Sequence, residues 1–228
     1  MNGLTHPGGL EITQKAFDLC RLSESAKVLD IGCGKGETAA YLTNKYNLRV
    51  TGIDKSNEAI SHAKEKYPGL EFMEGDGQSL DFGSLSFDCV LMECTLSLMS
   101  NPVEAIHEAY CVLKEGGYLI IHDLYLPDPS GEDLELIEQT RKSREEHKEN
   151  RTCGEESLLL CTVNGALVMD DIYAALDDLR FDKILFEDRK ADLKSYIASM
   201  IFDGIDNPVQ QGKSKASYYL LVAQKVKK

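Results

Sequence analysis

The 228-residue sequence lacks several features that would each mark a class of protein. It has no uninterrupted apolar run near the roughly eighteen residues of a membrane-spanning helix, and no basic start followed by an apolar segment. We therefore expect a cytoplasmic protein with no membrane partner. Basic residues number 25 against 38 acidic ones, for a net charge of -13. Because nucleic-acid binding requires an excess of Lys and Arg, this composition argues against a nucleic-acid partner and favours a small molecule.

The seven cysteines are also without an organising pattern. An odd number scattered along the chain differs from the dense, even framework of small secreted proteins, so we expect reduced thiols. No CxxC motif and no group of histidines supplies the ligand spacing of a structural zinc site. We therefore expect no resident metal, and the sequence does not indicate an oligomeric state.

Short apolar runs alternate with helical patterns along most of the chain, which predicts an α/β fold. Apolar residues recur at helical spacing in residues 10–21, so a helical segment within residues 1–25 precedes the first strand. Because each parallel pairing needs a crossover connection, the alternation predicts a doubly wound, mostly parallel, seven-stranded sheet in one domain over residues 1–228, with its last two strands as an antiparallel edge. The expected strands are 27–31, 49–54, 70–76, 87–92, 116–123, 181–188 and 217–226, and further helices begin near 37, 57, 102, 169 and 191.

A charged insertion interrupts the alternation at residues 126–160. Between residues 128 and 156 there are ten acidic and five basic residues, a density typical of a solvated helix held partly by pairs three or four residues apart. The insertion follows the fifth strand, so we expect it to lie over the carboxyl ends of the strands as a lid.

The stretch VLDIGCGKGETAAYL places three glycines directly after a buried strand that contains Asp30. Gly32, Gly34 and Gly36 allow the backbone to turn sharply and to approach a ligand at the N-terminus of the next helix. Twenty-two residues beyond Gly32, the second strand ends in Asp54, whose carboxylate can accept hydrogen bonds from ribose hydroxyls. These features predict a cofactor that contains a nucleoside.

The same loop argues against a dinucleotide. The G-x-G-x-x-G fingerprint requires its third glycine at position 37, where this chain has Glu37. A carboxylate at that helix start would repel a pyrophosphate. The loop therefore makes an NAD-dependent oxidoreductase the less favoured function.

At these motifs the sequence resembles the class I S-adenosylmethionine-dependent methyltransferases, from about residue 26 to the last strand. EGDGQSLDF resembles the family's adenine loop, and VLKEGGYLII resembles its turn before the fifth strand. The resemblance implies S-adenosyl-L-methionine as cofactor and S-adenosyl-L-homocysteine as product. It implies that Asp30 and the glycine loop hold the aminoacyl part of the cofactor and that Asp54 holds the ribose. Lys55, Asp76 and Gly77 would then lie beside the adenine, and Glu93 beside the amino group. The implied cofactor-binding residues are Asp30, Gly32, Cys33, Gly34, Asp54, Lys55, Asp76, Gly77 and Glu93.

The end of the fourth strand lies where ligands bind an open α/β sheet, so Glu93 and Cys94 should border the transferred methyl group. There ECTLSLM, and later CTVNGAL, resemble two cysteine contexts of the arsenite methyltransferase branch. This second resemblance implies that Cys94 and Cys161 converge on one soft acceptor such as thiol-bound trivalent arsenic, with Cys153 as a candidate third thiol. Thiolates suit such an acceptor because they bind thiophilic centres.

Two other functions stay open at this point. In HDLY, which ends the fifth strand, His122 could act as a general base with Asp123 or Tyr125 for an oxygen or nitrogen acceptor. Alternation along the strand places His122 and Asp123 on opposite faces, so only one of them faces the cleft readily. A module that binds the cofactor without catalysis would need the same glycine loop and strand-end acids. Glu93 could contribute its backbone alone or a catalytic carboxylate.

Overall fold

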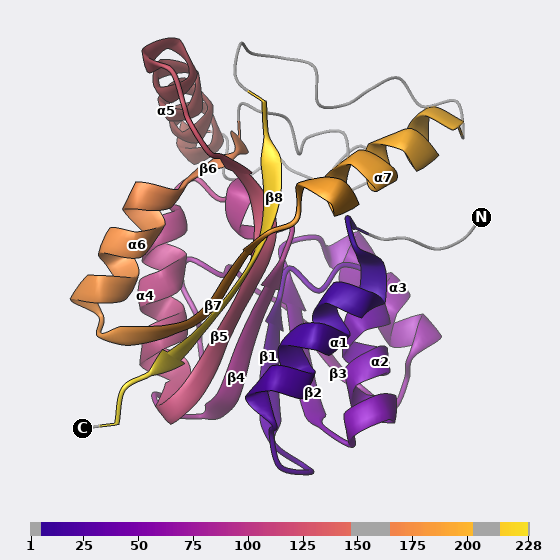
Figure 1. Ribbon diagram of the computed structural model, residues 1–228. Helices are drawn as coiled ribbons and strands as arrows, with labels where there is room; N and C mark the ends of the chain where they lie inside the picture. The colour runs from indigo at the N-terminus through magenta and orange to yellow at the C-terminus, as the bar shows by residue number, and fades with distance from the viewer. Residues whose placement is uncertain (1–5, 147–164, 203–214, 228) are drawn as a thin grey trace.

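The computed structural model describes residues 6–146, 165–202 and 215–227, and its strands form one continuous sheet (Figure 1). The strand order is β3-β2-β1-β4-β5-β8-β7, and β6 pairs with β5 beside this path. The strands from β3 to β5 pair in parallel, whereas β8 runs antiparallel to both β5 and β7. The strands are β1 (Lys27–Ile31), β2 (Arg49–Asp54), β3 (Glu71–Glu74), β4 (Phe87–Glu93), β5 (Leu113–Leu126), β6 (Leu167–Val168), β7 (Phe181–Asp188) and β8 (Ser217–Lys225).

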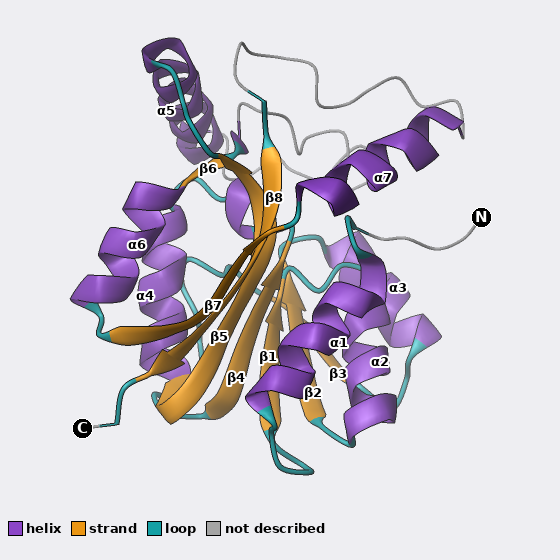
Figure 2. Ribbon diagram, in the orientation of Figure 1, coloured by secondary structure: helices purple, strands orange, loops and turns teal. Residues whose placement is uncertain are grey.

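Helices cover both faces of the sheet, as Figure 2 shows. Side chains of α1, α2, α3 and α7 share one apolar layer with one face of the sheet. Side chains of α4 and α6 share a second layer with the other face. The helices are α1 (Gly9–Cys20), α2 (Glu37–Tyr46), α3 (Asn57–Lys66), α4 (Pro102–Val112), α5 (Gly131–Glu146), α6 (Met169–Asp178) and α7 (Lys190–Phe202), with a short 3-10 helix η1 (Leu96–Leu98) between β4 and α4.

Local sequence signals explain where the helices near the strand ends begin. The hydroxyl of Ser56 accepts a hydrogen bond from Ala59 N at the start of α3. At the start of α4, the side chain of Asn101 accepts one from Glu104 N, and Pro102 occupies a first-turn position. Both α3 and α4 therefore begin in loops that follow strand ends, and these loops lie at the carboxyl edge of the parallel strands.

The strand order confirms the predicted doubly wound sheet with its antiparallel pair at one edge. The predicted fifth strand, 116–123, was too short, because β5 covers Leu113–Leu126. The pairing of β4 with β5 shifts register between Phe87 and Cys89, and Gly116 has φ +78°. The expected glycine turn is thus an irregularity inside a longer strand. β6 was not predicted, because two residues carry no readable apolar pattern.

The described part of the charged insertion is the helix α5, which lies at the carboxyl end of the sheet (Figure 1). Near its end, buried Arg144 donates a hydrogen bond to Ser97 O at 2.5 Å, and Ser100 donates one to the Glu145 carboxylate at 2.6 Å. α5 is therefore attached to the loop between β4 and α4. Residues 147–160 of the insertion lie outside the described residues, and its role as a lid stays a prediction.

Within the described segments, no helix is both long and apolar enough to cross a membrane.

The glycine loop supplies a test of the fold. Gly36 has φ +82°, and a Cβ there would lie 2.5 Å from Phe72 Cζ and 3.3 Å from Ala63 Cβ. We expect Gly36→Ala to lower the free energy of unfolding by about 2–4 kcal/mol, because left-handed strain and overpacking add. Urea denaturation measures the change. Gly69→Ala is the control, since a Cβ at Gly69 meets nothing within 4 Å. Equal midpoints for the two variants would contradict this account.

Candidate functional site

Three carboxylates lie on one face of the sheet at the carboxyl ends of adjacent strands. Asp30 is on β1, Asp54 ends β2 and Glu93 ends β4, and these strands are direct neighbours. Burial raises the pKa of Asp30 well above its ordinary value, and the nearby carboxylates of Glu93 and Asp54 raise it further. Among the described residues, Asp30 Oδ2 has no hydrogen-bond partner although it is buried. Burial and the neighbouring carboxylates therefore disfavour the ionised form of Asp30, and a bound cation would stabilise that form.

The glycine loop is held against the end of β2. Gly32 N and Cys33 N both donate hydrogen bonds to Ile53 O, at 2.8 and 3.0 Å, and Gly34 N donates one to Asp54 Oδ2 at 3.0 Å. Gly34 has φ +52°, and a Cβ there would meet nothing within 4 Å. The loop backbone is thus open to a ligand at Gly34. The predicted loop residues and Asp54 lie together.

Cys33 differs from its neighbours in where its side chain lies. The thiol is buried, and a Cβ added at Gly52 would lie 2.8 Å from Cys33 Sγ. Burial is the main cause that raises the pKa of this thiol. A cofactor at the loop would therefore contact the backbone of Cys33 rather than its sulfur.

The residues predicted for the adenine lie at the ends of β2 and β3. Lys55 Nζ lies 2.9 Å from Asp76 Oδ2, and Gln78 N donates a hydrogen bond to Asp76 Oδ1 at 2.9 Å. Partial burial raises the pKa of Asp76, but the hydrogen bond from Gln78 and the Lys55 ammonium hold this pKa below its ordinary value. Gly77 packs closely, because a Cβ there would lie 2.5 Å from Ile31 Cγ2.

The Glu93 side chain is the centre of a buried polar cluster. Its Oε1 accepts a hydrogen bond from Thr13 Oγ1 at 2.6 Å, and its Oε2 accepts one from Thr38 Oγ1 at 2.7 Å. His122 Nε2 lies 2.6 Å from Oε1, and His6 Nε2 lies 3.6 Å from Oε2. Burial raises the pKa of Glu93, but the two imidazoles and the hydrogen bonds lower it well below its ordinary value. The carboxylate is therefore ionised, and its side chain as well as its backbone is engaged at this edge.

His122 and Asp123 lie on opposite faces, as alternation along β5 predicts. Ile120 and Leu124 belong to the layer shared with α1 and α2, while Ile121 belongs to the layer shared with α4. Asp123 accepts hydrogen bonds from the backbone N–H groups of Ser97, at 2.8 Å, and of its neighbour in β5. Burial raises its pKa. Asp123 thus supports the loop after β4 and does not face the three carboxylates. Tyr125, on that same face, donates a hydrogen bond to an Asp188 carboxylate oxygen.

His122 has both ring nitrogens engaged. Its Nε2 contacts Glu93, and its Nδ1 lies 2.7 Å from Tyr218 Oη. The same tyrosine hydroxyl lies 3.0 Å from Cys94 Sγ. Cys94 itself has φ 49°, and its N–H donates a hydrogen bond to His122 O. The predicted acceptor residues Cys94 and His122 therefore lie together through Tyr218.

The structure does not test whether Cys94 meets a second thiol, because Cys161 and Cys153 lie outside the described residues. Their convergence on one acceptor stays a prediction.

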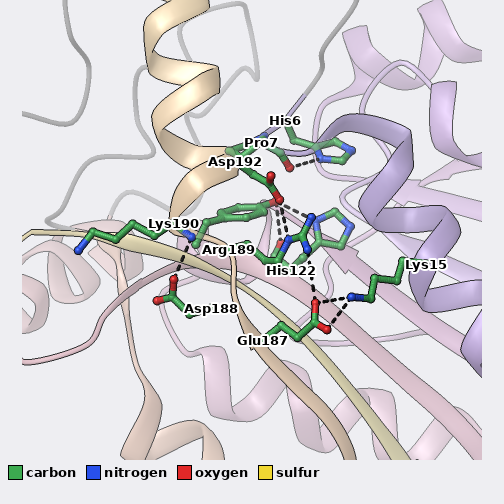
Figure 3. A network of polar contacts seen from close by, with 10 residues as sticks. His6, Pro7, Lys15, His122, Glu187, Asp188, Arg189, Lys190 and Asp192 are labelled. Carbon is green, nitrogen blue, oxygen red and sulfur yellow. Dashed lines mark hydrogen bonds and ion pairs between the residues drawn. The ribbon is translucent and has the colours of Figure 1, made fainter.

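Sequence reasoning missed four members of the Glu93 cluster, namely His6, Thr13, Thr38 and Tyr218. Thr13 had a readable signal, because it is a polar residue on the otherwise apolar buried face of α1. His6 and Tyr218 had none, since their positions depend on packing of both chain ends against the sheet. Figure 3 shows His6 above His122, close to the turn between β7 and α7, and the two ring centroids are 4.8 Å apart.

The threonine hydroxyls allow a test of the cluster. Thr38→Val keeps the shape of the side chain but removes a donor to the buried Glu93 carboxylate, so we expect the free energy of unfolding to fall by about 1–3 kcal/mol. Thr43→Val is the matched control in the same helix, where the hydroxyl donates only to Ala39 O, and should change stability by less than about 1 kcal/mol. Thermal and urea denaturation of both variants provide the comparison. A larger loss in Thr43→Val would argue against the cluster as a stabilising unit.

Comparisons with known proteins agree with this geometry. Residues 29–121 match a family described as a methyltransferase domain. The chain is 33% identical over 143 residues to phosphoethanolamine N-methyltransferase 1 of Arabidopsis thaliana, a match that covers 60% of this chain and 29% of the relative. It is 33% identical over 139 residues to the uncharacterized methyltransferase YodH of Bacillus subtilis, covering 58% of this chain and 59% of the relative. The chain thus spans less than two thirds of the length of these curated relatives.

A solved structure has a similar fold. Phosphoethanolamine N-methyltransferase 2 of Haemonchus contortus, in complex with S-adenosyl-L-methionine, aligns with a TM-score of 0.74 at 16% identity, covering 99% of this chain and 55% of that one. The strand order and this structural likeness lead to one conclusion: the chain has the α/β fold of the methyltransferases, and residues 29–121 within it match a methyltransferase domain.

Proposed function

We propose that the chain binds S-adenosyl-L-methionine at the carboxyl ends of β1 to β4 and transfers its methyl group to a small-molecule acceptor, with S-adenosyl-L-homocysteine as the product. The observation that carries the proposal is Asp30, whose buried carboxyl oxygen lacks a partner among the described residues and lies near two further carboxylates. The cofactor brings a sulfonium and an ammonium, so it would supply cationic charge that stabilises the Asp30 carboxylate.

The residues around the glycine loop suit the other parts of the cofactor. The open backbone at Gly34 leaves room for the aminoacyl part beside Asp30. Asp54 already accepts hydrogen bonds from Gly34 N and Ser56 N, but a carboxylate has lone pairs to spare for the ribose hydroxyls. Lys55, Asp76 and Gly77 would border the adenine.

Methyl transfer makes few chemical demands on the protein beyond this binding. The sulfonium is already a reactive methyl donor, so the enzyme has to hold the acceptor lone pair in line with the methyl group and exclude water. The buried cluster around Glu93 and His122 lies at the ends of β4 and β5, where the methyl group would be. Polar groups held in place there could orient an acceptor.

We propose that the methyl acceptor is a nitrogen or oxygen atom. Relatives of the chain include phosphoethanolamine N-methyltransferases, whose name specifies a nitrogen acceptor. Two earlier candidates are less suited to activate it. Asp123 faces the opposite layer, and both nitrogens of His122 are engaged, so His122 would position Glu93 and Tyr218 rather than act as an unengaged base. A thiol-held metalloid is the competing acceptor, but the Cys94 thiol already lies at hydrogen-bonding distance from Tyr218.

Binding and transfer can be measured separately. We expect calorimetry to detect the cofactor binding to the purified chain, and Asp54→Ala to weaken it by about 10- to 100-fold through loss of charged hydrogen bonds. Asp182→Ala, at an exposed position of β7, is the control and should bind normally. Transfer of labelled methyl is then assayed with primary amines including phosphoethanolamine, with quinols and carboxylates, and with arsenite plus a thiol reductant.

Each outcome of that assay distinguishes one function. Methylated amine or oxygen products support the proposal. Methylated arsenic that is lost in Cys94→Ser would favour the thiol-held acceptor instead. Binding without transfer to any acceptor indicates a module without catalysis, and absence of binding would overturn the cofactor site itself.

Asp30 adds a pH dependence to cofactor binding. Its raised pKa favours the protonated form in the unliganded chain, and a bound cation favours the carboxylate, so binding should release a proton. Affinity should therefore increase with pH between the lower pKa of the complex and the raised pKa of the unliganded chain. Calorimetry in two buffers of different ionisation enthalpy measures the release. Cofactor binding to Asp30→Asn should release fewer protons than binding to the parent chain. Equal proton release from both proteins would assign the proton to another group.

A further inference from the structure

We propose that His6, Glu93 and His122 bind a divalent transition-metal ion, with zinc as the best-fitting metal. The three side chains each offer one ligand atom, and these atoms lie within 4.8 Å of one another. They come from the segment before α1, the end of β4 and β5, so only the folded chain brings them together. Two imidazoles and one carboxylate form a common ligand set for zinc and for non-haem iron.

His6 is already oriented as a ligand. Its Nδ1 lies 3.2 Å from Pro7 O, and a carbonyl can only accept, so Nδ1 carries the hydrogen and the neutral ring has its lone pair on Nε2. His6 Nε2 is buried and makes no hydrogen bond within the described part of the chain. Figure 3 shows the contact with Pro7 and the ring directed over His122. Histidines that bind metals usually donate their other ring nitrogen to a carbonyl or carboxylate in this way.

Two of the donor distances are close to those of a metal site, and all of the donor atoms lie within 4.8 Å of one another. In a tetrahedral zinc site with bonds of about 2.0–2.1 Å, donor atoms lie about 3.3 Å apart. His6 Nε2 is 3.6 Å from Glu93 Oε2, and His122 Nε2 is 2.6 Å from Glu93 Oε1. An ion would replace the proton shared by His122 and Glu93, which requires these two side chains to separate by less than an ångström. His122 Nδ1 would then donate to Tyr218 Oη, 2.7 Å away.

The surroundings favour a cation at this position. In the described segments, the basic side chains beside the Glu93 carboxylate are His6 and His122, and no Lys or Arg pairs with it. Asp30 adds a second buried carboxylate on the same face. The hydroxyls of Thr13 and Thr38 hold the Glu93 oxygens in place, which is the role that outer hydrogen bonds play around metal ligands.

Three protein ligands leave a fourth position open, the arrangement of catalytic rather than structural zinc. The site differs from the expectation of no resident metal, which rested on cysteine and histidine spacing along the sequence. That spacing could not reveal ligands from three distant segments.

Metal binding can be tested without an activity assay. The full-length chain is stripped with a chelator and titrated with Zn²⁺ or Co²⁺, followed by metal analysis and by the visible absorption of Co²⁺. We expect one tightly bound ion per chain, a Co²⁺ spectrum of nitrogen and oxygen ligands without thiolate charge-transfer bands, and a rise in Tm on loading. His6→Ala should weaken binding at least 10-fold and remove the rise in Tm, and Glu93→Gln should do the same. His107→Ala, which changes an exposed histidine of α4, should bind like the parent chain.

His6→Ala keeps the test valid if Glu93→Gln does not fold, because His6 lies outside the helices and strands and circular dichroism can confirm an intact fold. Equal affinity of the parent chain and His6→Ala would overturn the proposal, as would thiolate bands in the Co²⁺ spectrum or no bound ion at all.

Discussion

The polar organisation of this molecule depends on one buried negative charge, the carboxylate of Glu93. A carboxylate removed from water costs several kcal/mol unless it is fully paired and hydrogen-bonded. Here hydroxyls from α1 and α2 and an imidazole from β5 supply that pairing, so the charge constrains where two helices and two strands meet. The segment before α1 reaches the same carboxylate through His6. The edge where strands end is thereby held in one arrangement from several directions.

This arrangement separates the carboxyl edge of the sheet into two zones with different chemistry. Around Asp54 the zone consists mainly of backbone groups of the glycine loop, and the space beside Gly34 is open because this residue has no side chain. Around Glu93 the zone consists of imidazole, hydroxyl and thiol groups that contact each other. Asp30 lies between them with an unpartnered oxygen. A cofactor that spans both zones would place its reactive group where the second begins.

Sequence reasoning succeeded where the deciding interactions are local or repeat along the chain. The alternation of strands and helices, the glycine loop and the spacing of Asp30 and Asp54 are properties of neighbouring residues, and they predicted the sheet and the position of the loop beside Asp54. The placement of His122 and Asp123 on opposite faces followed from strand alternation alone. Strand alternation could not decide whether His122 or Asp123 points toward the site, because that depends on which helices cover each side of the sheet.

The sequence by itself therefore determined the class of fold, the antiparallel pair at its edge and the glycine loop that follows the first strand, since periodicity and turn chemistry act over a few residues. Only the tertiary structure decided what surrounds Glu93. Thr13 lies 80 residues away along the chain, and Tyr218 lies 96 residues from the His122 that it contacts. No local pattern encodes such contacts, because they arise when the sheet closes against helices from both ends of the chain. The physical reason is that a buried charge selects its partners by distance in space and not by position in the sequence.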